Sequence, residues 1–287
     1  MTMLDDAAAA VDAPARVAAV VPAPDTARAQ FGLADYVGEV ALLLGAGSAV
    51  MNQLALVGVG KGVAEHSNTF ERPLDRLRTT LTYVYALTMG TDEERAAIAR
   101  MVNRAHGPIK GDGYTAFDPR LQLWVAATLA YGGEQMYEKT FGPMDEATRE
   151  RTYREGWVLG TTLQVTEEMW PATRAEFTAY WEQMQGELSP DPVVQRYARQ
   201  LLSARAAKWY LVPSVALQSL LTRGNLTPRV REVLDLPWRR RDQWAYDLFW
   251  AVFRTTYPLV PKVVRTAPAR LLLRDMRKRM AANRRVI

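Results

Sequence analysis

Apolar residues recur at three- and four-residue spacing through almost all of the chain from residue 72 onward, a spacing typical of helices that bury one face. No convincing run of alternating apolar and polar residues indicates a strand. The chain is therefore predicted to be all-α, a multi-helix single domain large enough to bury a substantial core. The predicted helices cover 72–89, 92–106, 119–141, 144–163, 171–187, 192–206, 213–222, 227–234, 238–257 and 264–283.

Several of these helices carry recognisable start signals. Thr91 precedes three acidic residues, so its hydroxyl can cap free amides while the carboxylates favour the positive end of a helix. Asp118 followed by a proline indicates a second helix start. Proline suits the first turn because its missing N–H would be unpaired there, and we assign this position to Pro119, Pro171, Pro213 and Pro228.

Residues 41–60 hold no charged residue over twenty positions, which is the length of a membrane span. Asn52 and Gln53 lie in the middle of this segment, and four glycines and Ser48 lower its apolarity. A membrane span therefore stays an alternative, and we favour a buried helix or helix pair whose small residues allow close packing.

Composition changes at both ends of the chain. Residues 1–28 are rich in Ala, Pro, Val and Asp and are expected to form a flexible leader without the features of a secretory signal. The main domain is expected over 29–258, and 259–287 as a basic C-terminal helix, since 262–287 carries nine basic residues against Asp275. That helix either lies on an anionic membrane surface or, as we favour, packs its few apolar residues against the rest of the protein. It has no aromatic residue, so nucleic acid is not an expected partner.

The chain has no cysteine and only two histidines, which excludes disulfides, thiolate zinc sites and iron–sulfur clusters. A transition metal would need His66 or His106 as its anchor, and a macrocyclic cofactor with one protein ligand fits best. His106 closes a predicted helix directly before Gly107, where the residues alone favour a C-terminal cap over an axial ligand. His66 is expected in a polar surface loop, and its neighbour Glu65 is a candidate general base.

Arg76 and Thr80 are four residues apart, so on a helix they share one face. Arginine can hold a carboxylate or polarise bound oxygen, and threonine can orient water or dioxygen, although such a pair is more often a solvated face. The glycine-rich segment 107–113 does not follow a strand and so fails as a dinucleotide loop. Serine-nucleophile, HExxH and Walker motifs are absent from the sequence.

Three segments in succession carry a family resemblance: RPLDRLRTTLTYVYALTMGT, HGPIKGDGYTAFDPRLQLWVAATL and WPATRAEFTAYWEQM. Over roughly residues 30–255 the chain resembles the domain shared by MpaB oxygenases and bacterial latex-clearing proteins, formerly a domain of unknown function. The resemblance implies an all-helical fold with a globin-like core, a haem b held by one histidine, and oxygen-dependent cleavage of carbon–carbon double bonds in isoprenoid chains.

The resemblance also implies roles for individual residues. Arg76 and Thr80 match the family's Arg-x3-Thr near the haem, His106 matches the axial iron ligand, and Lys110 stands where a basic residue can face a propionate. Ala126 departs from the pattern, because many relatives have a histidine there.

The sequence therefore predicts a haem b-dependent oxygenase that uses dioxygen on a hydrophobic, isoprenoid- or polyketide-like substrate. It is expected in the cytoplasm, with association with a membrane as the open alternative. The alternatives are a haem-binding or sensing protein without turnover, and a helical membrane-surface protein that has lost haem.

Overall fold

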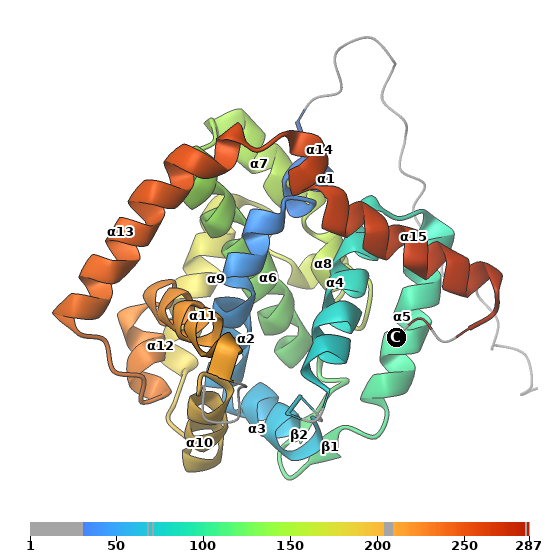
Figure 1. Ribbon diagram of the computed structural model, residues 1–287. Coiled ribbons are helices and arrows are strands. Elements are labelled where there is room, and N and C mark those ends of the chain that lie inside the picture. Colours follow the sequence, from blue (N-terminus) through green and yellow to red (C-terminus); the bar gives the residue numbers. More distant parts are fainter. Residues whose placement is uncertain (1–30, 68, 71, 204–208, 285, 287) are drawn as a thin grey trace, which may run out of the picture. The chain divides into compact units, whose positions relative to one another are not determined.

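The computed structural model describes residues 31–67, 69–70, 72–203, 209–284 and 286 (Figure 1). Almost all the regular structure in these ranges is helical, which confirms the all-α prediction. The α-helices are α1 Leu33–Val37, α2 Ala46–Ala55, α3 Val57–His66, α4 Pro73–Met89, α5 Asp92–His106, α6 Pro119–Phe141, α7 Glu146–Glu155, α8 Val158–Thr161, α9 Arg174–Glu187, α10 Pro192–Leu201, α11 Val212–Gly224, α12 Pro228–Val233, α13 Arg240–Thr256, α14 Lys262–Arg265 and α15 Ala267–Ala281. Short 3-10 turns cover η1 Val40–Gly45, η2 Glu167–Met169, η3 Trp209–Leu211 and η4 Tyr257–Leu259.

Side-chain caps start helices α5, α6, α7, α9, α10 and α12, while two of the expected boundaries are wrong. The Thr91 hydroxyl accepts a hydrogen bond from the Glu94 amide at 3.2 Å and starts α5, as predicted. Pro171 does not begin a helix. Helix α9 starts after Thr173 instead, whose side chain accepts a hydrogen bond from the Glu176 amide. The single helix expected over 144–163 is wrong as well, since α7 ends at Glu155 and α8 starts at Val158.

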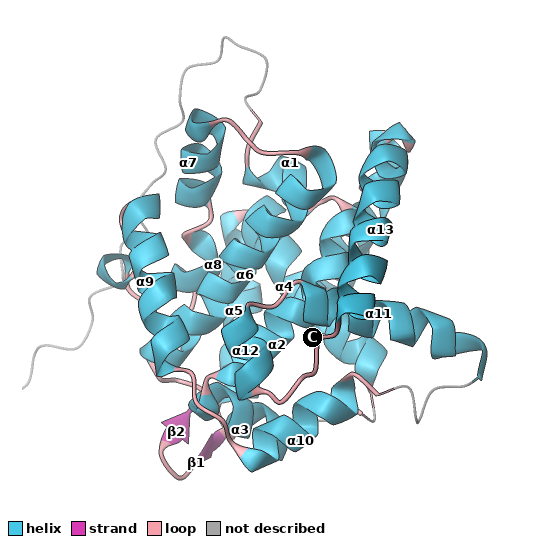
Figure 2. Ribbon diagram, turned by 90° about the vertical axis from the view of Figure 1, so that its left-hand side faces the viewer, coloured by secondary structure: helices cyan, strands magenta, loops and turns pink. Residues whose placement is uncertain are grey.

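The described residues also contain one small antiparallel hairpin that the sequence analysis did not predict. Strands β1 Lys110–Gly111 and β2 Tyr114–Thr115 pair directly after α5 (Figure 2). Gly113 closes the turn with a φ of +76°, a conformation that glycine adopts without steric cost. Two residues are too short a strand to leave an alternating pattern in the sequence.

The uncharged segment 41–60 forms a bent helix pair, as we favoured. Its α2 and α3 parts meet at Leu56, and the axes of Val40–Ala55 and Val57–His66 differ by 109°. Among the described residues no single helix is long and apolar enough to cross a membrane, and only this bent pair has the necessary length and composition. Gly60 permits the bend, because a Cβ there would stand 2.4 Å from the carbonyl oxygen of Leu54.

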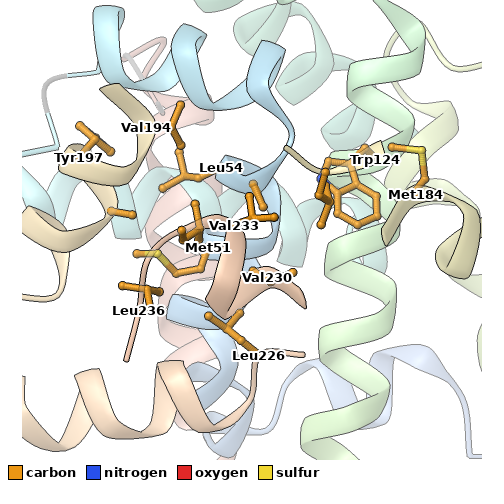
Figure 3. Packing of buried hydrophobic residues seen from close by; sticks show 14 of the residues in the cluster. Met51, Leu54, Trp124, Met184, Val194, Tyr197, Leu226, Val230, Val233 and Leu236 are labelled. Atoms are coloured by element: carbon orange, nitrogen blue, oxygen red, sulfur yellow. The ribbon is translucent and has the colours of Figure 1, made fainter. Parts of the chain in front are cut away.

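The largest hydrophobic cluster joins α2, α6, α9, α10 and α12 (Figure 3). Met51 and Leu54 of α2 are at most 2% exposed and lie beside residues of α10 and α12. On α6, the fully buried Trp124 stacks on Trp181, whose ring in turn stacks on Tyr131 with centroids 3.9 Å apart. Burial of this apolar surface holds α6 and α2 together and so fixes the walls of the cavity described below.

Residues 31–287 form one compact unit, and the expected leader 1–28 lies outside the described residues. Within this unit α15 packs along α4. Ala269, Leu273 and Met276 of α15 are buried in a cluster with Tyr85 and Ile98. The basic C-terminal helix thus docks its apolar side internally, which is the alternative that we favoured.

Candidate functional site

A mostly apolar cavity of about 600 Å³ lies between the helices, a size typical of small-molecule sites. Its walls come from segments far apart in the sequence, including α1, α2, α4, α6, α9, α10 and α11. The apolar part of the lining includes Leu33, Leu43, Met51, Leu54, Leu77, Leu81, Val84, Leu129, Leu159, Phe177, Trp181 and Leu201. Such a lining favours a hydrophobic ligand, whose burial releases water from apolar surface.

Arg76 and Thr80 both line this cavity from successive turns of α4. The Thr80 hydroxyl donates to the carbonyl oxygen of Arg76 at 3.0 Å. Its proton is therefore engaged with the backbone, while its oxygen keeps a lone pair that can accept a hydrogen bond. The structure brings these two residues together on the wall of the apolar space.

His106 is the last residue of α5, where the sequence analysis expected it, and its side chain is half-buried. Its Nδ1 is buried and has no hydrogen-bond partner among the described residues. Burial lowers the pKa of His106, and the nearby positive charge of Arg76 lowers it further, so both effects favour the neutral imidazole. His106 does not line the cavity, but Arg76 lies on the cavity wall and close enough to act on the ring.

Glu65 and His66 lie elsewhere. His66 ends α3 and is exposed, so the loop expected there is wrong, because the helix continues through the residue. The Tyr114 hydroxyl donates to Glu65 Oε2 at 2.5 Å and lies 3.2 Å from His66 Nε2. Hydrogen bonding to Glu65 raises the pKa of Tyr114 to about 12. Neither Glu65 nor His66 lines the cavity, and Lys110 is exposed in β1.

The sequence analysis missed an ion pair in the cavity wall between Glu134 of α6 and Arg174 of α9. Arg149 stands behind it, with its Nε 3.8 Å from Glu134 Oε1. Burial raises the pKa of Glu134, and the charge of Arg174 opposes that rise. Glu134 and Glu138 are the two carboxylates of the largely apolar helix 119–141, and a carboxylate in such a helix is a signal that a buried ion pair could have been expected there.

Residues 33–255 match the family model described as the ER-bound oxygenase mpaB/B′/rubber oxygenase catalytic domain. The chain belongs to this family. The match runs from α1 into α13 and includes every cavity helix named above, so the resemblance is confirmed and the enzyme class it indicates is an oxygenase.

Two similar relatives are uncharacterized proteins of Mycobacterium tuberculosis and Mycobacterium bovis. Each is 36% identical over 256 residues, which cover 86% of this chain and 100% of the relative. No solved structure matches the chain.

Ala126, the departure from the mpaB/rubber oxygenase pattern, is 2% exposed on α6 and does not line the cavity. It belongs to an apolar cluster that includes Tyr153, Leu159 and Trp170. In the part of the chain that the structure describes, no three His, Cys, Asp or Glu side chains gather as a group that could hold a metal ion.

Proposed function

We propose that this member of the mpaB/rubber oxygenase family is a haem b-dependent oxygenase acting on a hydrophobic substrate held in the cavity. The observation that carries the proposal is the position of Arg76: it lies on the wall of an apolar cavity and beside an imidazole whose surroundings favour its neutral form and whose Nδ1 has no partner in the described residues. Family membership supplies the reaction class.

The residues present fit a haem with a single protein ligand. A neutral imidazole keeps a lone pair for iron, and the surroundings of His106 favour that form over the charged one. Arg76 would pair with a haem propionate by a charge-assisted hydrogen bond. When bound, the haem would supply the binding and activation of dioxygen.

The remaining chemistry falls to side chains of the cavity. Leu77, Leu81 and Val84 continue the Arg76–Thr80 side of the wall and would orient an apolar chain while excluding water. The Thr80 oxygen would accept a hydrogen bond close to the reacting centre. An isoprenoid- or polyketide-like chain and oxidative cleavage of its double bond suit this lining. Glu65 has no part in the proposal, because it accepts its hydrogen bond from Tyr114 away from the cavity.

Absorption spectra of the protein purified with ample haem test the ligand. We expect a Soret band in the wild type and in His66→Ala, the matched control, and loss or displacement of that band in His106→Ala. An unchanged spectrum in His106→Ala would overturn the ligand assignment, and a wild type that takes up no haem would overturn the cofactor.

Oxygen uptake by the haem-loaded protein with a long-chain alkene then separates an oxygenase from a protein that only binds haem. We expect alkene-dependent uptake that the corresponding saturated alkane does not elicit. A Soret band without such uptake across isoprenoid and linear alkenes would favour the sensing alternative.

A further inference from the structure

The outer side of α13 carries a stripe of large apolar side chains at every fourth residue. Trp244, Leu248 and Val252 are 68%, 48% and 54% exposed. Two more large apolar side chains shortly after the helix, Leu259 of η4 and Val263 of α14, are 81% and 68% exposed. We call these five residues the α13–α14 face.

The opposite side of α13 is a normal core-facing side. Tyr246 and Trp250 are 7% exposed and belong to a cluster with Met136 and Leu221. In Figure 1, α13 lies at the outer edge of the described unit, and no ribbon covers its outer side. Several large apolar side chains exposed together on a folded protein indicate an interaction site.

The charges around the α13–α14 face point to an anionic partner. The exposed ionisable residues from 239 to 262 are Arg239, Arg240, Arg241, Arg254, Lys262 and Asp247. Lys262 is paired with Asp35 at 2.9 Å and Arg241 lies 3.9 Å from Asp242, so the positive charge beside the face comes mainly from Arg239, Arg240 and Arg254. Asp242, the other carboxylate in this stretch, lies half-buried with an oxygen 3.9 Å from Arg223. Arginine side chains beside apolar residues can place their stems on an apolar phase and their guanidinium groups among phosphates.

The same arginines oppose pairing with a second copy of this chain. A parallel pair of α13 helices would bring the two 239–241 clusters together. An antiparallel pair would bring the 239–241 cluster of each copy beside the Arg254 end of the other. Like charges meet in both arrangements, which disfavours a self-complementary interface.

We propose that the α13–α14 face binds the surface of an anionic lipid bilayer. Trp244, Leu248, Val252, Leu259 and Val263 enter the interfacial region, where tryptophan is favoured, and the flanking arginines contact lipid phosphates. The contact is distinct from the basic helix α15, whose apolar side is already buried against α4. The proposal does not depend on the haem or on the reaction.

Co-sedimentation with vesicles tests it on the full chain. One set of vesicles is one part phosphatidylglycerol to three parts phosphatidylcholine, and the other is phosphatidylcholine alone. We expect binding to the anionic vesicles that weakens at high salt, because the lipid charge is then screened. No binding of the wild type to the anionic vesicles overturns the proposal.

Two variants identify the face. Val252→Glu should lower the vesicle partition coefficient by about tenfold, since it places a charge in the interfacial contact. Val193→Glu on α10 is the matched control, because Val193 is 43% exposed and lies outside the α13–α14 face. If vesicle binding falls equally in both variants, or does not fall in Val252→Glu, the α13–α14 face is not the membrane-binding surface. Circular dichroism confirms that both variants are folded.

A third variant tests the charge. Arg240→Gln combined with Arg241→Gln should reduce binding to anionic vesicles while leaving any binding to neutral vesicles unchanged. Light scattering without lipid tests whether a second copy of the chain binds the face instead. A concentration-dependent dimer in the wild type that is lost in Val252→Glu would assign the face to dimerisation and overturn the proposal.

Discussion

The guanidinium of Arg265 lies 3.3 Å from the carboxylate of Glu39, and the two side chains are 12% and 4% exposed. The Tyr257 hydroxyl donates to the same carboxylate at 2.9 Å, and Arg265 stacks over the Phe141 ring at 5.0 Å. This buried pair ties the segment before α2 to the segment before α15.

Removal of one partner should leave a buried charge unpaired. We expect Glu39→Leu to lower the free energy of unfolding by about 3 kcal/mol or more, measured by urea denaturation. The double variant with Arg265→Met removes both charges and should lose less than the sum of the two single variants. If the free energy of unfolding of Glu39→Leu falls by less than about 1 kcal/mol, the Arg265 guanidinium is hydrated in the variant and is not left unpaired.

Ala126→His, which introduces the residue common in the family, should destabilise this protein. The position is 2% exposed and packed in an apolar cluster, so an imidazole there is both too large and without a partner. We expect a loss of about 2–3 kcal/mol by thermal or urea unfolding. Ala251→His at an exposed position of α13 is the control and should be near neutral. A stable Ala126→His variant with higher haem content would contradict this expectation.

Gly47 of α2 lets α11 approach closely. A Cβ at Gly47 would stand 2.1 Å from Thr222 Oγ1 and 3.2 Å from Gln218 Nε2. Gly47→Ala should therefore cost about 1–3 kcal/mol of stability through overpacking. Thr222→Ala in the same chain removes the obstructing oxygen and should recover most of that loss in a double-mutant cycle. Additive losses would mean that the α2–α11 spacing does not depend on this contact.

Lys139 should make the free energy of unfolding depend on pH, and the sign of that dependence follows from its pKa. Its Nζ donates to Asn225 Oδ1 at 2.9 Å and to the Tyr246 hydroxyl, and burial lowers its pKa to about 8. An unfolded lysine keeps its proton to about pH 10, so between these values the unfolded chain binds more protons and the free energy of unfolding rises with pH.

Relative to Lys139→Met, the wild type should thus gain stability from pH 7.5 to pH 9.5, by about 1 kcal/mol after allowance for partial solvent screening. Urea denaturation of both proteins at the two pH values measures the difference. Parallel behaviour of the two proteins would show that the lysine titrates as it does in water.

Thr80→Val should separate chemistry from stability. Within the described part of the chain the Thr80 hydroxyl bonds to the Arg76 carbonyl alone, so its loss should change the free energy of unfolding by about 1 kcal/mol or less. If the proposed function is correct, alkene-dependent oxygen uptake should fall by about tenfold or more. Thr79→Val, on the adjacent position that does not line the cavity, should keep the wild-type rate. Equal rates in the two variants would remove Thr80 from the reaction.

Helix positions were predictable where periodicity and caps agreed, as for α5 and α6, whose bounds match the sequence prediction. The helix start predicted at Pro171 was wrong because proline is also common in the loop before a helix. Glu134 stands out in the sequence as a carboxylate in an apolar helix, but its partner Arg174 could not be predicted, since residues 40 apart meet only through packing of α6 against α9. The spacing of Trp244, Leu248 and Val252 is that of a core stripe, and only the fold shows that it faces outward.

Most of the cavity lining is enclosed, but Arg76, Leu77 and Thr80 on consecutive turns of α4 are exposed while they also line the cavity, as are Val50 of α2 and Thr178 of α9. If a ligand enters on the exposed side of α4, these turns form part of the rim that it passes. Any molecule admitted there passes the two polar side chains before it reaches the apolar interior. The same short stretch of helix would then affect both which compounds enter and how oxygen reacts. A substitution that improves one of these properties would also alter the other.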